Sequence, residues 1–315
     1  MRGAFIDALM ELAATDERVW LLTGDLGFSV LEPFRERFPD RFVNAGVAEQ
    51  NMTGVAAGLA LSGKIAFTYS IANFPTLRCL EHVRNDVCYH DLAVKIVSVG
   101  GGTVYGSLGY THHAVEDLAI MRTLPNITVI APGDPVEVRL AVRALAARPG
   151  PAYLRLGRAS ETVVHPREPA FEIGVPIVVR EGEDAVVVST GGMLVPVVQA
   201  ADLLAAEGIR IRVVSLHTLK PLDAGALARA VAGPRHVFCV AEHVEAGGLG
   251  EMVAAPLADL LASGVTLHDL HLGSENLFSV GRREHLLTRH GLDPAGIAAA
   301  VRGEVQAGRR RAADG

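Results

Sequence analysis

Cysteine is scarce in this chain: Cys79, Cys88 and Cys239 are the only three among 315 residues. They are too few and too scattered for a disulfide framework or a CxxC metal site, and a reduced cytoplasmic setting is expected. Positive charge is also in deficit, since the net charge is -6. Without a basic surplus to neutralise phosphates, a nucleic-acid partner is not expected. No run of about 18 uncharged apolar residues occurs, so we expect no membrane span.

The common phosphate-binding motifs are missing as well. The glycines of Gly100-Gly-Gly-Thr-Val-Tyr-Gly106 fit the spacing of neither GxGxxG nor GxxxxGK[ST], and Gly247-Gly-Leu-Gly250 does not fit either. These glycines allow tight turns at strand ends. Neither a nicotinamide-dependent dehydrogenase nor a P-loop enzyme is therefore supported.

Apolar residues make up 50% of the chain, and short runs rich in valine and isoleucine alternate with helical patterns. Runs that are apolar on both faces are typical of parallel sheets covered by helices. The fold class predicted from this alternation is α/β, with two doubly wound sheet domains. The predicted strands are 19–23, 64–68, 94–99, 128–131, 185–189, 211–215 and 237–240.

Helix signals and a proline-rich stretch divide the chain. Asp134, Pro135 and Glu137 have the spacing of a helix start, and a helix is predicted from there to just before Arg148. A second predicted helix runs from about 194 to 207. Residues 164–177 carry several prolines and little periodicity. We predict a first domain over 1–163, a linker over 164–177 and a second domain over 178–315.

The stretch Asn44-Ala-Gly-Val-Ala-Glu-Gln-Asn-Met52 places a single carboxylate, Glu49, between a turn and a helix of very small residues, 53–60. An acid in that position can hold a flat, nitrogen-rich ligand. It can equally stabilise its own helix through the helix dipole. Spacing alone leaves both interpretations open.

Three further segments carry candidate site residues, each with a structural alternative. The aromatics Tyr69 and Phe74 follow strand 64–68 and suit either a core or a stacking platform. In the loop Gly109-Tyr-Thr-His112-His113, adjacent histidines point in different directions and make a poor metal pair. The guanidinium of Arg158 suits a phosphate or sulfonate, but also a surface ion pair.

Gly46-Val-Ala-Glu49, followed by Gln-Asn-Met52 and the Gly/Ala-rich helix, resembles the aminopyrimidine-binding motif of the transketolase family. The resemblance extends over nearly the whole chain, to the pyrimidine-binding domain before 163 and to the C-terminal domain after 178. It implies thiamine diphosphate as the cofactor, with Glu49 bonded to N1′ of the pyrimidine. That bond favours the imino tautomer, whose exocyclic nitrogen removes the C2 proton of the thiazolium.

The resemblance also assigns roles to the other candidates. Phe74 matches the aromatic that stacks on the pyrimidine, with Tyr69 as a substitute. His112 matches the histidine that lies beside the substrate's oxygen atoms and shuttles protons. Ser29 and Arg158 match residues that contact the sugar phosphate.

The family's diphosphate motif, Gly-Asp-Gly followed by a metal-ligating Asn, is absent, because Gly24-Asp-Leu does not continue correctly. That motif holds the cofactor's Mg²⁺. The resemblance therefore implies an N-terminal partner subunit that carries the Mg²⁺ ligands, in an α2β2 assembly, and no metal ligands are expected in this chain.

The substrate loop departs from ordinary transketolases at two positions. Leu108 falls nearest to an aspartate that bonds a sugar hydroxyl, and Gly100 falls where the family has a phosphate-side histidine. We expect Leu108 to be buried and unable to accept a hydrogen bond. Hydroxyl recognition has then moved elsewhere, or the sugar differs.

The leading prediction is a subunit of a thiamine-diphosphate-dependent transketolase that moves a two-carbon ketol unit from a ketose (phosphate) to an aldose (phosphate). One alternative is the β subunit of a 2-oxoacid dehydrogenase E1, against which the Thr111-His112 loop weighs. Another is a non-catalytic partner subunit of the same fold. The sequence does not identify the sugars.

Overall fold

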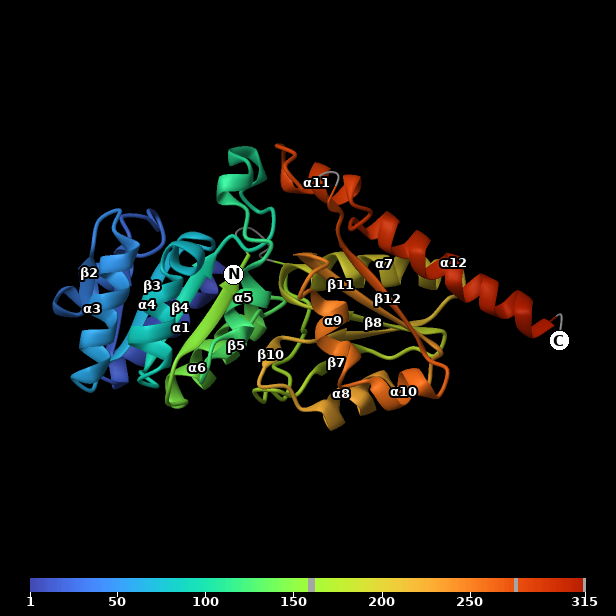
Figure 1. Ribbon diagram of the computed structural model, residues 1–315, viewed down its shortest axis with the longest axis horizontal. Helices are drawn as coiled ribbons and strands as arrows, with labels where there is room; N and C mark the ends of the chain where they lie inside the picture. The colour runs from blue at the N-terminus through green and yellow to red at the C-terminus, as the bar shows by residue number, and fades with distance from the viewer. Residues whose placement is uncertain (158–161, 275–276, 314–315) are drawn as a thin grey trace.

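The computed structural model describes residues 1–157, 162–274 and 277–313. Two sheets, each flanked by helices, lie side by side along the long axis of the molecule (Figure 1). The predicted α/β class with two doubly wound sheets is confirmed. Among the described residues no helix is long and apolar enough to cross a bilayer.

The first sheet has seven strands, parallel except for one edge strand. In spatial order they are β10 (Thr218–Lys220), β5 (Thr128–Ile130), β6 (Ala152–Leu156), β4 (Val94–Val99), β3 (Ile65–Ile71), β1 (Val19–Thr23) and β2 (Phe42–Asn44). The α-helices of this half are α1 (Arg2–Thr15), α2 (Glu32–Arg37), α3 (Glu49–Leu61), α4 (Leu80–His82), α5 (Asp117–Thr123) and α6 (Pro135–Ala147).

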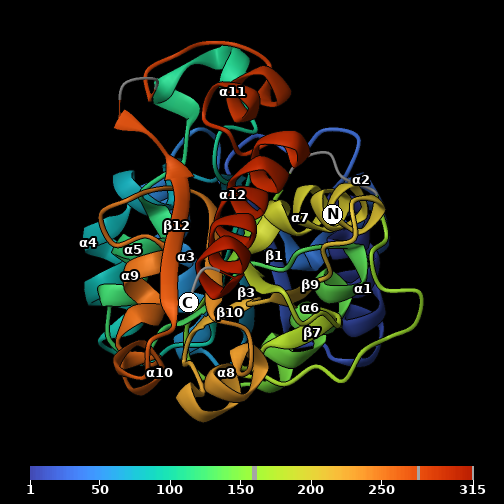
Figure 2. The same ribbon diagram turned by 90° about the vertical axis from the view of Figure 1, so that its right-hand side faces the viewer.

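The second sheet has five strands, and only β7 runs antiparallel to its neighbour. Their order is β12 (Thr266–Leu272), β11 (His236–Val244), β8 (Ala185–Ser189), β9 (Ile211–Ser215) and β7 (Ile177–Arg180). The α-helices are α7 (Leu194–Ala206), α8 (Ala224–Val231), α9 (Leu249–Ala254), α10 (Ala258–Ala262), α11 (Arg283–Arg289) and α12 (Pro294–Ala313). In Figure 2, α12 crosses the view in front of the sheet, beside α7.

Alternation along the strands explains why the runs are apolar throughout. Leu21 and Phe67 belong to a core formed with α1 and α6, whereas Leu22 and Ile96 belong to a core formed with α3. Successive side chains of a strand point to opposite faces, and here both faces are covered. The register pairs Leu21 with Phe67 across β1 and β3, so each core is continuous across the sheet.

The helix predicted after Asp134 is confirmed as α6. The Asp134 side chain accepts a hydrogen bond from the amide of Glu137 at 2.8 Å, as an N-cap does. The carboxylate of Glu137 accepts from the amide of Gly133 at 2.6 Å. This helix start also fastens the following chain, because the second oxygen of Asp134 accepts from the amides of Val164 and His165.

The second half of the chain contributes one strand to the first sheet, which the sequence analysis did not predict. β10 follows β9 of the second sheet, yet it pairs antiparallel with β5 of the first, with Thr218 opposite Ile130. The ammonium of Lys220 donates to the carbonyls of Arg122 and Leu124. The second half therefore completes the edge of the first sheet. The exact domain limits at 163 and 178 stay a prediction.

Candidate active site

The carboxyl ends of β2, β3 and β4 lie along the same edge of the first sheet. The segments that follow these strands bring the candidate residues together there. Glu49 begins α3, Phe74 begins a π-helix (Phe74–Arg78) directly after β3, and His112 lies in the loop after β4. Ligands of open α/β sheets bind outside the carboxyl ends of the strands.

Glu49 is buried, with 2% of its surface exposed. It lies in the first turn of α3, where the helix dipole stabilises a negative charge. Gly24 lies beside it, since a Cβ added there would be in van der Waals contact with Cγ of Glu49, at 3.4 Å. The carboxylate accepts a hydrogen bond from Nη1 of Arg78 at 2.7 Å. A buried acid is thus held against a cation whose side chain is 47% exposed.

The guanidinium of Arg78 also lies over the ring of Phe74, with its central carbon 4.8 Å from the ring centroid. A flat cation therefore bonds to Glu49 and stacks on Phe74 at once. A protonated aminopyrimidine is likewise a flat cation with an N–H donor. The residues present fit the pyrimidine end of thiamine diphosphate, and Arg78 makes the contacts in its place.

His112 joins this group through Phe74. Their ring centroids are 5.3 Å apart in an edge-on arrangement. The side chain of Asn73 donates to the carbonyl of Thr111, which fastens the histidine loop to the π-helix. Nδ1 of His112 lies 3.0 Å from the hydroxyl of Thr111. The structure thus brings Glu49, Phe74 and His112 into one cluster with Arg78.

Tyr69 is placed elsewhere. Its ring stacks on Phe5 at 5.7 Å in the core beneath α1, on the face of β3 opposite α3. Burial raises the pKa of its phenol. Because β3 alternates, Tyr69 points away from Glu49, and Phe74 is the aromatic that the cluster contains.

Among the described residues, the anion candidate Ser29 forms no hydrogen bond with this cluster. Ser29 is exposed in the loop after β1, in a left-handed conformation with φ +64, and its amide donates to the carboxylate of Glu32 at 2.8 Å. Arg158 lies outside the described residues.

The adjacent histidines do point in different directions. His113 is buried and faces Tyr110, with ring centroids 6.0 Å apart, whereas His112 faces Phe74. Burial lowers the pKa of His113. The hydroxyl of Tyr110 donates to Glu116, and this bond raises the pKa of Tyr110 to about 12. These contacts hold the loop that presents His112.

The two departures in the substrate loop have structural counterparts. Leu108 is 54% exposed, so the expectation that it is buried was wrong. It lies at the end of a short 3-10 helix (Gly106–Leu108), where its side chain faces solvent. Gly100 has φ +85, and a Cβ there would lie 2.1 Å from the ring of Tyr105. A histidine at Gly100 would therefore require the ring of Tyr105 to move.

Sequence reasoning missed the role of Arg78. A usable signal was present, because Phe74 and Arg78 stand four residues apart, and residues at that spacing share a helix face. The contact with Glu49 was not visible, since 29 residues separate Arg78 from that acid in sequence.

The two doubly wound domains, with a buried acid beyond the carboxyl ends of the strands, define the class of open α/β proteins that bind ligands at that edge. Residues 1–162 match the transketolase pyrimidine-binding domain, and residues 174–297 match the transketolase C-terminal domain. The chain belongs to the transketolase family, and that membership implies the use of thiamine diphosphate.

Similar proteins are subunits of split transketolases. An apulose-4-phosphate transketolase subunit of Phocaeicola vulgatus is 35% identical over 298 residues, covering 94% of each chain. A 6-deoxy-6-sulfo-D-fructose transketolase subunit of a Clostridium species is 36% identical, covering 82% of this chain and 81% of the other. The solved structure of a split-gene transketolase, described as an inactive β4 tetramer, is 37% identical with a TM-score of 0.84, covering 97% of both chains. This chain thus corresponds to the C-terminal half of a split transketolase.

Proposed function

We propose that this chain is the cofactor-activating subunit of a two-subunit, thiamine-diphosphate-dependent transketolase. It transfers a two-carbon ketol unit from a ketose to an aldose. The observation that carries the proposal is the buried carboxylate of Glu49, which already holds a flat cation over Phe74.

The cofactor supplies the nucleophilic carbon when it is bound. Glu49 accepts a hydrogen bond from the protonated pyrimidine nitrogen, and burial strengthens this bond because water does not compete for the carboxylate. Phe74 orients the ring by stacking. His112 has its Nδ1 beside Thr111, so its Nε2, which has no hydrogen bond within the described residues, is available to a substrate oxygen.

A partner subunit completes the site. This chain lacks the Gly-Asp-Gly…Asn motif, so we assign the Mg²⁺ ligands and the diphosphate contacts to an N-terminal subunit. The similar split-gene transketolase is inactive as a β4 tetramer, which supports a partner requirement. We propose an assembly with two copies of each subunit.

The substrate we propose is a ketose with an anionic end. The substrates for which two relatives are named carry a phosphate and a sulfo group. Ser29 and Arg158 are the residues proposed to contact that end, because a guanidinium fork pairs well with either group.

The test is reconstitution with the N-terminal subunit, thiamine diphosphate and Mg²⁺, followed by assays with ketose donors and with 2-oxoacids. Turnover with ketoses alone supports a transketolase. Release of CO₂ from 2-oxoacids selects the 2-oxoacid dehydrogenase alternative. No turnover under either condition, with Glu49→Ala binding cofactor as well as wild type, selects a non-catalytic subunit.

Within the same assay, Glu49→Ala isolates the acid. We expect its rate to fall by about 10²–10⁴, the usual cost of losing a positioned proton-transfer partner. Glu36→Ala is the matched control, because Glu36 is an exposed acid on α2. Equal rates for the two variants would exclude a role for Glu49 in activation.

A further inference from the structure

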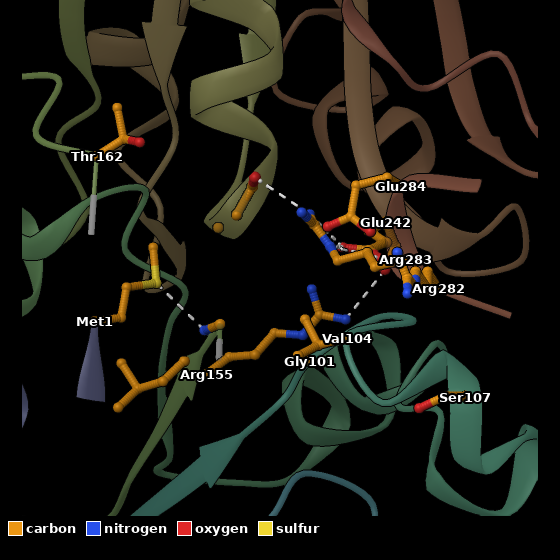
Figure 3. A pocket seen from close by; sticks show the side chains of 14 residues that line it. Met1, Gly101, Val104, Ser107, Arg155, Thr162, Glu242, Arg282, Arg283 and Glu284 are labelled. Carbon is orange, nitrogen blue, oxygen red and sulfur yellow. Dashed lines mark hydrogen bonds and ion pairs between the residues drawn. The ribbon is translucent and has the colours of Figure 1, made fainter. Parts of the chain in front are cut away.

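A cavity of about 440 Å³ lies between the two domains, away from Glu49 (Figure 3). Its walls come from the loop after β4, the end of β6, the turn after β8, the end of β11 and the start of α11. The volume is within the range of small-molecule sites. None of Glu49, Phe74 and His112 lines it, so it is a second candidate site.

The topology of the second sheet puts this cavity where ligands are expected. From β8 the chain passes through α7 to β9 on one side, whereas β11 lies on the other side of β8 and leads on to β12. The order of strands therefore reverses between β8 and β11. Gly191 and Gly192 follow β8, Glu242 lies near the end of β11, and all three line the cavity. Open α/β sheets bind ligands at such a switch point.

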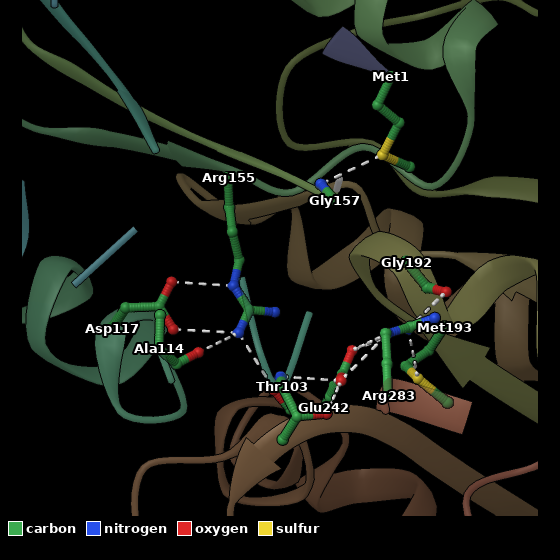
Figure 4. A network of polar contacts seen from close by, with 10 residues as sticks. All are labelled: Met1, Thr103, Ala114, Asp117, Arg155, Gly157, Gly192, Met193, Glu242 and Arg283. Carbon is green, nitrogen blue, oxygen red and sulfur yellow. Dashed lines mark hydrogen bonds and ion pairs between the residues drawn. The ribbon is translucent and has the colours of Figure 1, made fainter. Parts of the chain in front are cut away.

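A buried ionic network forms the floor of the cavity (Figure 4). Arg155, which is 4% exposed, donates from Nε and Nη2 to Asp117 at 2.9 and 3.1 Å. Glu242 accepts from Nε and Nη2 of Arg283 and from the amide and hydroxyl of Thr103. The oxygens of both carboxylates are thus bonded to protein donors, and the other acid that lines the cavity, Glu284, is exposed at the start of α11.

Donors remain free on the cavity side. Nη1 of Arg155 makes no hydrogen bond to any described residue, although its side chain is almost fully buried, and it points into the open space (Figure 3). It lies on the side of the turn after β8, 3.9 Å from where a Cβ on Gly191 would be. At the rim, Arg282 is exposed and forms no ion pair with a described residue.

We propose that this interdomain cavity binds the phosphate group of a small phosphate monoester at Nη1 of Arg155, with Arg282 at the rim as a second cation. A buried guanidinium donor and a second cation suit a doubly charged oxyanion. Gly191 and Gly192, which follow β8 and line the cavity next to Arg155, have no side chains that would block the phosphate. The phosphate belongs either to a separate small molecule or to a substrate whose anionic end enters this cavity in place of contacts with Ser29 and Arg158.

The test is calorimetric titration of the full chain, without partner or thiamine, with inorganic phosphate and with a ketose phosphate at constant ionic strength. Val104, which lines the cavity, provides a matched pair of variants. In Val104→Glu a carboxylate competes for the same arginines, so we expect affinity to fall by about tenfold or more. Val104→Gln has nearly the same shape without the charge, and we expect it to stay within about threefold of wild type.

A second pair guards against a folding defect at Val104. Arg282→Gln should weaken binding by about fivefold or more, whereas Arg289→Gln, on the adjoining helix but outside this cavity, should not. If wild type binds no phosphate at concentrations up to about 10 mM, its binding free energy is weaker than about -3 kcal/mol and the proposal is overturned. Equal affinity of Val104→Glu and Val104→Gln, or of Arg282→Gln and Arg289→Gln, would overturn it as well.

The reconstituted enzyme then identifies the source of the phosphate. If the substrate's own phosphate enters, Val104→Glu raises KM for a phosphorylated donor but not for its unphosphorylated analogue. If a separate molecule binds, both KM values stay unchanged and any effect of added phosphate on the rate is lost. Both outcomes require binding to the chain alone, so the proposal is tested independently of transketolase activity.

Discussion

Arg78 occupies the place proposed for the pyrimidine ring, so the cofactor must displace it. The displaced contact is one charge-assisted hydrogen bond of 2.7 Å between a buried acid and a guanidinium that is 47% exposed. Because one partner is exposed to water, the free energy that this bond contributes is about 1–2 kcal/mol, less than that of a fully buried pair. In Arg78→Ala this competition is gone, and we expect thiamine diphosphate to bind about five- to thirtyfold more tightly.

The same change has a cost in the free chain. Removing Arg78 leaves the carboxylate of Glu49 buried without its partner, so the melting temperature of the chain without cofactor should fall. Added cofactor should then raise the melting temperature of Arg78→Ala more than that of wild type. Tighter binding together with lower stability of the free chain is the signature of a residue that stands in for the ligand.

The assay is titration of the reconstituted complex with thiamine diphosphate and Mg²⁺, followed by quenching of intrinsic fluorescence or by calorimetry. Arg84→Ala is the matched control, because Arg84 lies in the next turns of the same segment and its side chain donates only to its neighbour Asn85 among the described residues. Weaker cofactor binding in Arg78→Ala would refute the reasoning. It would mean that Arg78 turns to bind the cofactor instead of leaving it.

Two further predictions concern buried ion pairs. Burial lowers the pKa of His165, but its hydrogen bond to Glu137 at 2.8 Å and the charges of Glu137 and Asp134 together outweigh burial, so the net pKa is raised. The charged imidazole therefore adds stability below a pH of about 6.5 that is lost as the pH rises through the folded-state pKa. We expect His165→Gln to lower the urea-derived free energy of unfolding more at about pH 6 than at about pH 8.5, and equal losses at both would contradict this. Asp117→Ala should lower the free energy of unfolding by about 3–5 kcal/mol in the same measurement, because it leaves the buried Arg155 without its carboxylate. Glu11→Ala, which removes an exposed ion pair, should lower it by less than about 1 kcal/mol. Similar losses for the two variants would exclude a structural role for the buried pair.

The sequence was informative where one local rule decides the outcome. The strands β1, β4 and β8 lie where the runs of valine, isoleucine and leucine predict them, because burial on both faces demands such runs. Helix α6 begins at Pro135 after Asp134, since a cap and a proline fix a helix start locally. Glu49 was recognised because its setting, an acid before a helix of small residues, is also local.

Contacts between distant segments could not be predicted in this way. β10 has three residues and no distinctive pattern, and its partner β5 is set by how the two halves dock. Arg155 was visible only as a charge inside an apolar strand, whereas its partners Asp117 and Glu242 lie 38 and 87 residues away. The placement of Tyr69 depends on which face of β3 packs against α1, and the sequence alone does not tell which residues of the strand point to that face.

The two candidate sites differ in what each needs to become complete. The cluster at Glu49 is built from the first domain alone, and in the free chain Arg78 holds the acid. The interdomain cavity draws on both halves of this chain, which β10 and the network from Asp117 to Arg283 tie together. Its buried donor, Arg155, is held by bonds that exist without a partner. Cofactor binding should therefore depend strongly on the N-terminal subunit, whereas phosphate binding in the cavity should be nearly the same with and without it. If adding the partner created phosphate binding where the free chain had none, the arginines of the cavity would not be positioned by the contacts described above.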